Sequence, residues 1–321
     1  MTVTASISTT AVIGSGYMGG GIAQVLALAG HHVALADIDG QTAENARIRL
    51  NAQATDFEAR GLMPTGAAEI IRENLSASDS IEDAVGGVDY VAEAVPEIRK
   101  LKLDILRRIS KTARPDAIIG TNTSAIPIGE LARAVTNPAR FLGVHWMNPA
   151  PFIPGVELIP SPSTAAQTMH IVEELIAHLG KIPARVADAP GFVANRLQFT
   201  LYKEALRMVE EGLATVNQID AVVSNSFGFR LALFGPFAIG DMAGLDVYES
   251  SYRTLETAYG ERFSTPESLA RTVRDGNLGF KSGQGFLNIS SADRDALLEY
   301  RDHAYARLSQ LRAELGKAPG L

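Results

Sequence analysis

One histidine and one glutamate are spaced so that two neighbouring strands could bring them together. His145 lies near the end of the apolar run FLGVHW, and Glu157 lies in the next strand-like run, GVELIP. A histidine titrates near neutral pH, and a carboxylate on its second ring nitrogen fixes the tautomer and stabilises the imidazolium. Such a pair can take a hydroxyl proton while a hydride leaves the same carbon. A histidine at a strand end is, however, more often structural, and Glu157 could be a surface charge.

A glycine-rich segment predicts a dinucleotide site. In TAVIGSGYMGGGIAQ, the G-x-G-x-x-G pattern follows strand-like residues and opens a helical pattern. These glycines allow a tight turn, close approach of a pyrophosphate and helix–strand packing, while helix N-terminal amides hold the pyrophosphate. A tight turn without a ligand is the alternative, but it would not need the acid that ends the next strand-like run, HVALAD. The predicted cofactor contacts are Gly14, Ser15, Gly16, Tyr17, Met18, Gly19 and Asp37.

Asp37 also selects between the two nicotinamide cofactors. A carboxylate at this position accepts hydrogen bonds from both ribose hydroxyls and repels the extra phosphate of NADP. No arginine follows Asp37 before Arg47, so nothing obvious would neutralise that phosphate. We predict NAD as the cofactor, and comparable affinities for NADPH and NADH would contradict this.

Alternating strand-like and helical patterns from Thr10 to Val186 predict an α/β fold with a Rossmann-type, doubly wound parallel sheet. The strand-like runs are TAVIG, HVALAD, DYVAEAV, AIIGTN, FLGVHW, VELIP and KIPARVAD. An insert at about 41–74 has interrupted helical periodicity and predicts a helical hairpin. The segment DAPG indicates a junction, so we predict an NAD-binding domain over 1–188 and an all-helical substrate and dimerisation domain over 189–321. The expected helices of that second domain span 192–213, 216–226, 244–259 and 293–315.

Composition narrows the class of protein. A chain of 321 residues with 46% hydrophobic content predicts two domains. The absence of cysteine excludes disulfides and cysteine-bound zinc and agrees with a reducing cytoplasm. Six histidines remain for chemistry, and we predict no metal site. A net charge of -7 without a dense basic block argues against nucleic acid. No signal peptide or membrane span is recognisable, so we expect a cytoplasmic protein that acts on a small molecule.

Several motifs together resemble the L-3-hydroxyacyl-CoA dehydrogenase family, and they occur in the same order. They are GSGYMGGGIA, VAEAVPE followed by Lys102, TNTSAI, HWMNPAP with VEL, DAPGFVANRL, GPFAIGDMAGLD and KSGQGF. The resemblance extends from Val12 to Phe286. It implies reversible, NAD-dependent oxidation of an L-3-hydroxyacyl-CoA to the 3-ketoacyl-CoA, as in fatty acid metabolism, by a homodimer formed through the helical domain.

The resemblance also assigns roles to residues. It implies that His145 is the general base or acid, that Glu157 orients it, that Ser124 binds the substrate oxygen, and that Asn195 helps to fix histidine and substrate. By the same resemblance, we expect four residues near the nicotinamide and its ribose: Glu97, Lys102, Asn148 and Lys281. Ser124 could instead cap a helix beginning near Pro127, Asn195 could be an ordinary polar residue, and both lysines could be solvated.

The substrate stays open between two classes. The segment FGFRLALFGPF is longer than the link typical of the acyl-CoA enzymes and resembles the L-gulonate and L-carnitine dehydrogenase branch. Its Arg230 could grip a free carboxylate in a bidentate manner, or could be a surface or dimer contact. The helical insert offers only Arg60 near its tip for CoA phosphates. We expect a 3-hydroxyacyl-CoA first and a free 3-hydroxy carboxylate second.

Two further classes of protein remain as alternatives. The superfamily resembles a lens crystallin that shares this scaffold, so a non-catalytic, nicotinamide-binding protein is one of them. The other is a β-hydroxyacid dehydrogenase with a lysine base, for which Lys203 is the candidate. A Lys203→Ala variant without turnover, beside an active His145→Ala variant, would favour that enzyme.

Overall fold

The computed structural model describes residues 7–320, which form two compact units that divide between Leu201 and Tyr202. Helix α8 (Ala194–Glu210) crosses this division. The domain junction at residues 188 and 189 stays a prediction.

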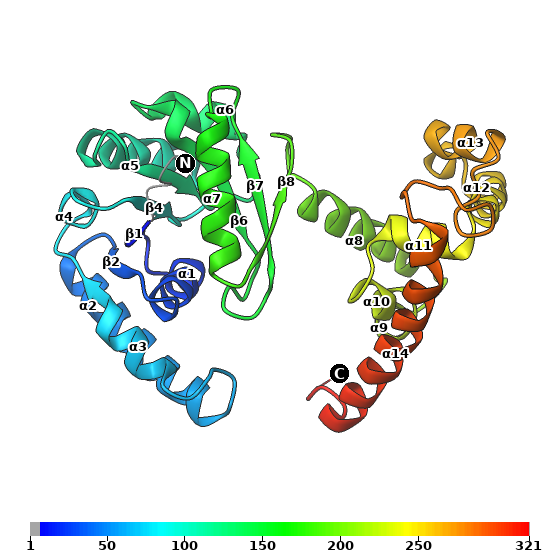
Figure 1. Ribbon diagram of the computed structural model, residues 1–321, viewed down its shortest axis with the longest axis horizontal. Helices are drawn as coiled ribbons and strands as arrows, with labels where there is room; N and C mark the ends of the chain where they lie inside the picture. The colour runs from blue at the N-terminus through cyan, green and yellow to red at the C-terminus, as the bar shows by residue number, and fades with distance from the viewer. Residues whose placement is uncertain (1–6, 321) are drawn as a thin grey trace. The chain divides into compact units, whose positions relative to one another are not determined.

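The first unit is built on an eight-stranded sheet with the order β3-β2-β1-β4-β5-β6-β7-β8 (Figure 1). Its strands are β1 (Thr9–Ile13), β2 (His32–Ala36), β3 (Leu75–Ala77), β4 (Tyr90–Glu93), β5 (Ile118–Thr121), β6 (Phe141–Trp146), β7 (Gly155–Pro160) and β8 (Ile182–Arg185). All predicted strands are present, while β3 is too short to show a period-two pattern. The six strands β3, β2, β1, β4, β5 and β6 are parallel to one another, as predicted. β7 and β8 run in the opposite direction, because β7 pairs antiparallel with β6 and parallel with β8.

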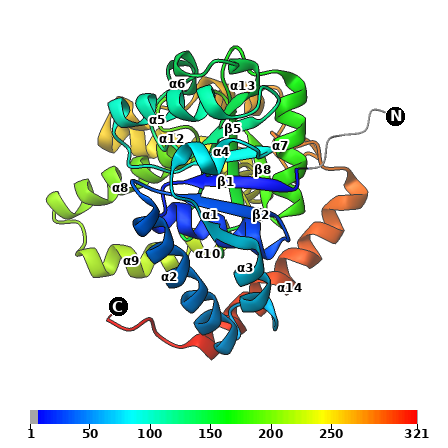
Figure 2. The ribbon, with the colours of Figure 1, turned by 90° about the vertical axis from the view of Figure 1, so that its left-hand side faces the viewer.

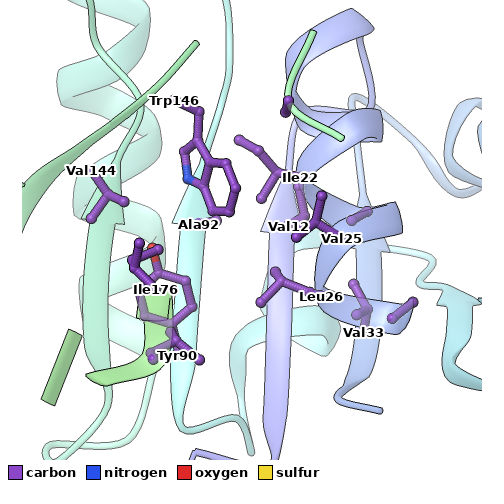
Figure 3. Packing of buried hydrophobic residues seen from close by; sticks show 14 of the residues in the cluster. Val12, Ile22, Val25, Leu26, Val33, Tyr90, Ala92, Val144, Trp146 and Ile176 are labelled. Atoms are coloured by element: carbon purple, nitrogen blue, oxygen red, sulfur yellow. The ribbon is translucent and has the colours of Figure 1, made fainter. Parts of the chain in front are cut away.

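Helices cover both faces of this sheet because successive strand residues point to opposite sides. Val12 packs in a cluster with residues of α1 (Tyr17–Leu28), α2 (Gly40–Ala59), α3 (Ala67–Asn74) and α7 (Ala166–His178). Figure 3 shows part of this cluster, including Ile22 of α1. The neighbouring Ala11 and Ile13 pack instead with residues of α4 (Ile81–Val85), α5 (Arg99–Thr112) and α6 (Ile128–Leu131). Short 3-10 helices follow at η1 (Ala132–Ala134) and η2 (Pro138–Arg140).

The predicted helical hairpin is present as α2 and α3. Both helices lie side by side in Figures 1 and 2, in contact with each other and with α1. α2 begins because Asp39 accepts a hydrogen bond from Thr42 N at 2.7 Å, which is N-capping by an aspartate.

The strand order reverses between β1 and β4, and doubly wound sheets bind their ligands at such a reversal. β1, β2, β4, β5 and β6 are parallel, so the loops at their carboxyl ends meet along one edge. Those loops and strand ends carry most of the predicted site residues. β7 runs antiparallel to β6, so its first residues lie at the same edge, beside the end of β6.

The second unit is helical. It contains the end of α8 and the helices α9 (Val216–Asn225), α10 (Phe227–Leu231), α11 (Pro236–Ala243), α12 (Leu245–Tyr259), η3 (Glu261–Phe263), α13 (Glu267–Arg274) and α14 (Ser291–Leu315). A capping box between Thr215 and Gln218 sets the start of α9. Within residues 7–320, no helix is long and apolar enough to span a bilayer.

Asp89 ties the start of β1 to the turn before β4. Its Oδ2 accepts hydrogen bonds from Ser8 N at 3.0 Å, Thr9 N at 3.0 Å and Thr9 Oγ1 at 2.9 Å. Partial burial alone would raise the pKa of Asp89, but these hydrogen bonds lower it from 3.8 to about 2. A depressed pKa in the folded state stabilises the fold above the unfolded pKa, and this stabilisation is lost as the pH falls through the folded value.

We therefore expect the free energy of unfolding to fall less steeply for Asp89→Asn than for the wild type between about pH 4 and about pH 2. Urea unfolding at a series of pH values measures this slope. Asp104→Asn removes an exposed helical carboxylate and serves as the control. Equal slopes for Asp89→Asn and the wild type would contradict the prediction.

Candidate active site

The glycine loop after β1 has the geometry of a pyrophosphate cradle. Gly14 has φ 98°, which favours glycine, and a Cβ at Gly19 would lie 1.8 Å from the Gly14 carbonyl oxygen. The chain's own atoms therefore require these two glycines. A Cβ at Gly16 would meet nothing within 4 Å, so no neighbour in the chain explains that glycine. Close approach of a ligand to the backbone does explain it.

Asp37 lies beside this loop, as the spacing predicts. Its Oδ2 accepts hydrogen bonds from Ser15 N at 2.6 Å and from Ser15 Oγ at 2.5 Å, while Oδ1 accepts one from Ile38 N at 2.8 Å. The carboxylate is thereby held next to the cradle, where the ribose of a dinucleotide would lie. Tyr17 and Met18 begin α1 at the mouth of the loop, and Tyr17 is exposed. These residues fit a dinucleotide.

His145 and Glu157 lie opposite each other in the β6–β7 ladder. His145 Nδ1 and Glu157 Oε2 are 2.8 Å apart, and the two residues are only 4% and 6% exposed. The antiparallel register of the two strands brings these two side chains into contact. The ring of Phe192 lies 5.6 Å from the imidazole, measured between centroids.

The second carboxylate oxygen of Glu157 is also hydrogen-bonded. Oε1 accepts hydrogen bonds from Val193 N at 3.0 Å and Ala194 N at 2.9 Å, at the start of α8. Burial alone would raise the pKa of Glu157, but the hydrogen bonds from His145 and from these two amides lower it below 4.5. An ionised carboxylate only accepts hydrogen bonds, so we assign the proton to Nδ1 of His145. Nε2 is then left as the acceptor that a general base needs.

Ser124 and Asn195 are brought together across a long stretch of chain. Asn195 Nδ2 donates to the Ser124 carbonyl oxygen at 3.1 Å. Ser124 does not cap the helix near Pro127, since α6 has no side-chain cap. Glu97 Oε1 accepts hydrogen bonds from Thr123 Oγ1, Ser124 N and Ala125 N, so it holds the loop that carries Ser124.

Lys102 is not the solvated surface lysine that we considered as an alternative. It is 0% exposed, and its Nζ lies 2.9 Å from Glu93 Oε1 and 3.5 Å from Glu97 Oε2. Glu93 is equally buried and also accepts hydrogen bonds from Val95 N and Thr121 Oγ1. The sequence pattern did not indicate Glu93. Lys102 therefore reaches the loop of Ser124 through Glu97.

Three further predicted residues are Asn148, Lys281 and Arg230. Asn148 is exposed in the loop after β6. Lys281 belongs to the second unit, where its Nζ lies 2.9 Å from both carboxylate oxygens of Asp246. Arg230 belongs to α10 of the same unit. The roles of Lys281 and Arg230 stay predictions.

Lys181 supports the loop after His145, and sequence reasoning missed it. Its Nζ donates to the carbonyl oxygens of Ala150 at 2.7 Å, Pro151 at 3.0 Å and Ile153 at 2.9 Å. Burial lowers the pKa of Lys181, and the three carbonyls stabilise the ammonium. Only the folded loop brings these carbonyls together, so no sequence pattern indicates them.

We expect Lys181→Met to lower the free energy of unfolding by about 1.5–3 kcal/mol, because the variant loses hydrogen bonds to a charged group and leaves carbonyls unpaired. Urea unfolding measures the change. Lys111→Met replaces an exposed lysine near the end of α5 and should leave stability nearly unchanged. A Lys181→Met variant as stable as this control would contradict the assignment.

Both parts of the chain match models of one protein family. Residues 9–189 match the model described as "3-hydroxyacyl-CoA dehydrogenase, NAD binding domain". Residues 191–289 match the model described as "3-hydroxyacyl-CoA dehydrogenase, C-terminal domain".

Individual relatives cover nearly the whole chain. A 5-formyl-3-hydroxy-2-methylpyridine 4-carboxylate 5-dehydrogenase of Mesorhizobium japonicum is 36% identical over 293 residues, 91% of this chain and 94% of the relative. A probable 3-hydroxybutyryl-CoA dehydrogenase of Deinococcus radiodurans is 34% identical over 276 residues, 86% and 98% of the two chains. The crystal structure of a 3-hydroxyacyl-CoA dehydrogenase from Archaeoglobus fulgidus is similar with a TM-score of 0.76 and 30% identity, covering 94% of this chain and 99% of that one.

Proposed function

The chain belongs to the 3-hydroxyacyl-CoA dehydrogenase family and is an NAD-binding oxidoreductase that acts on a CH–OH group, and we propose that His145 and Glu157 form its acid/base pair. The observation that carries this proposal is the buried hydrogen bond of 2.8 Å between His145 Nδ1 and Glu157 Oε2. The direction of this hydrogen bond leaves Nε2 of His145 free to take a proton.

The cofactor and the acid/base pair have different roles in the reaction. Bound NAD supplies the acceptor for the hydride. His145 Nε2 takes the proton of the 3-hydroxyl group during oxidation and returns it during reduction. Glu157 keeps the imidazole in the productive tautomer and stabilises the imidazolium, and the amides of Val193 and Ala194 keep Glu157 ionised.

Ser124 and Asn195 position the substrate oxygen. Glu97 holds the Ser124 peptide, and Asn195 bonds the same residue from α8, so Ser124 is held from two sides. The glycine loop and Asp37 bind the adenosine and pyrophosphate part of the cofactor. Glu97 and Asn148 contribute near the nicotinamide and its ribose, and Lys102 acts through Glu97.

A 3-hydroxyacyl-CoA is the first candidate substrate, as the names of the relatives from Deinococcus radiodurans and Archaeoglobus fulgidus indicate for those proteins. A free hydroxy carboxylate is the second candidate, and two observations favour it. The relative from Mesorhizobium japonicum is named for a pyridine carboxylate. Near the tip of the helical hairpin, Arg60 is the cation available for a CoA phosphate, and the nearby Asp56 lies 3.0 Å from it.

Parallel assays with NADH or NAD test the substrate class. Acetoacetyl-CoA with NADH represents the thioester, and gulonate and carnitine with NAD represent the free acids. Turnover of acetoacetyl-CoA well above that of both acids supports the first candidate. Turnover of either acid alone supports the second, and no turnover with any of them contradicts both.

We further propose that the protein is a cytoplasmic homodimer formed through its helical part. The second unit exposes large apolar side chains, among them Phe237, Val247 and Tyr300, and such surface is typical of a protein contact. Light scattering during size-exclusion chromatography measures the mass. A mass equal to one chain of 34.2 kDa would contradict the dimer.

A further inference from the structure

Arg49 of α2 lies at the cofactor loop although it is distant from that loop in sequence. Its Nη2 donates to the Ser15 carbonyl oxygen at 2.8 Å. The same residue, Ser15, donates to Asp37 Oδ2 from its backbone nitrogen at 2.6 Å and from its hydroxyl at 2.5 Å. One residue of the loop thus connects a guanidinium group to the carboxylate that we expect to bind the ribose.

Packing between α1 and α2 places Arg49 there. A Cβ at Gly20 would lie 2.8 Å from Leu50 Cδ2, so the two helices approach closely at this point. Gln24 Nε2 also donates to the Leu50 carbonyl oxygen at 3.0 Å. Leu50 is buried against α1, and the preceding residue, Arg49, is therefore held over the start of that helix.

The neighbouring arginine on the same helix behaves differently. Arg47 Nε and Nη2 donate to the Glu44 carboxylate at 2.7 and 2.6 Å, so its charge is compensated. Arg49 forms no ion pair with any carboxylate in the part of the chain that the structure describes, and it is exposed. A guanidinium has five donors, and the bond to Ser15 uses one of them. Its charge and its other donors remain for an anionic ligand.

We propose that Arg49 is a positioning and specificity-determining residue of the cofactor site. It holds the Ser15 peptide in the conformation that binds the pyrophosphate, and it places a positive charge next to the ribose position. The segment between Asp37 and Arg47 contains no arginine, and this was the reason to expect no cation for a 2′-phosphate. Arg49 supplies that cation, so repulsion by Asp37 is what excludes NADPH.

NADH titrations without substrate test the positioning role. We expect Arg49→Met to weaken NADH binding about five- to tenfold, the value of one hydrogen bond to a ligand-binding loop. Arg47→Met is the matched control and should bind NADH as the wild type does. Arg49→Lys retains a long side chain with a donor for the Ser15 carbonyl oxygen, and should bind NADH more tightly than Arg49→Met. Equal NADH affinities for Arg49→Met and Arg47→Met overturn this role.

NADPH titrations test the specificity role. We expect Asp37→Ser to bind NADPH at least about tenfold more tightly than the wild type, because the repulsion is removed and the guanidinium remains. Adding Arg49→Met or Arg49→Gln should remove most of this gain, and adding Arg47→Met should keep it. A gain that survives both changes at Arg49, or no gain in Asp37→Ser, overturns the proposal. Thermal unfolding of each variant shows whether a loss of affinity comes from a loss of folded protein. Arg49→Met and Arg49→Gln both remove the positive charge, so both should reduce NADPH binding.

Discussion

Replacing His145 with glutamine will lower turnover by about 10²–10⁴-fold while NADH binding stays unchanged. Glutamine is polar and of similar size but cannot accept and return a proton at neutral pH. Glu157 would remain bonded to the amides of Val193 and Ala194, so the local structure should persist. Steady-state rates and an NADH titration on the same samples measure the two quantities.

A matched control exists on the same unit. His170 and Glu174 form an exposed pair on α7, with 3.2 Å between His170 Nε2 and Glu174 Oε1. His170→Gln should keep full turnover, because that pair lies at the surface and outside the site. A His145→Gln variant with more than about a tenth of wild-type turnover would contradict the assignment. Loss of turnover in Lys203→Ala, with activity kept in His145→Ala, would move the base to Lys203.

Replacing Lys102 with methionine will destabilise the first unit by about 3–5 kcal/mol, because it leaves the buried carboxylate of Glu93 without its countercharge. Both side chains are 0% exposed, so water cannot compensate the remaining charge. The loop of Ser124 should also loosen, since Lys102 restrains Glu97. Urea unfolding, followed by a probe in the first unit such as Trp146, measures the loss.

Two variants make this measurement specific. Lys100→Met removes an exposed lysine from the same helix and should cost little. The double variant Glu93→Leu/Lys102→Met removes both charges and should recover part of the lost stability, because an apolar pair can replace a buried ion pair. The recovery stays incomplete, because Val95 N and Thr121 Oγ1 lose the acceptor that Glu93 provides. If Lys102→Met is as stable as Lys100→Met, the buried ion pair has no such role.

The strands, the helical hairpin and the glycine loop could be predicted because each depends on local order along the chain. Short strand-like runs between helical patterns indicated the strands, and the glycine spacing with Asp37 indicated the cofactor loop. β3 was missed because three residues carry no period. The reversal of β7 was also missed, since strand direction depends on the connecting turn and on pairing, which periodicity does not record.

The contacts that organise the site depend on residues far apart in the chain. Residue types at positions 145 and 157 indicated proton chemistry, but the antiparallel register of β6 and β7 makes them touch. The sequence left open whether Lys102 is a solvated surface lysine. The fold buries it in an ion pair with Glu93. Arg49 escaped notice because packing of α2 on α1, and not spacing from Asp37, carries it to Ser15. Local patterns therefore identify which groups the chain possesses, while long-range packing sets which of them meet, because hydrogen bonds and ion pairs require distances of a few ångströms that only the folded chain provides.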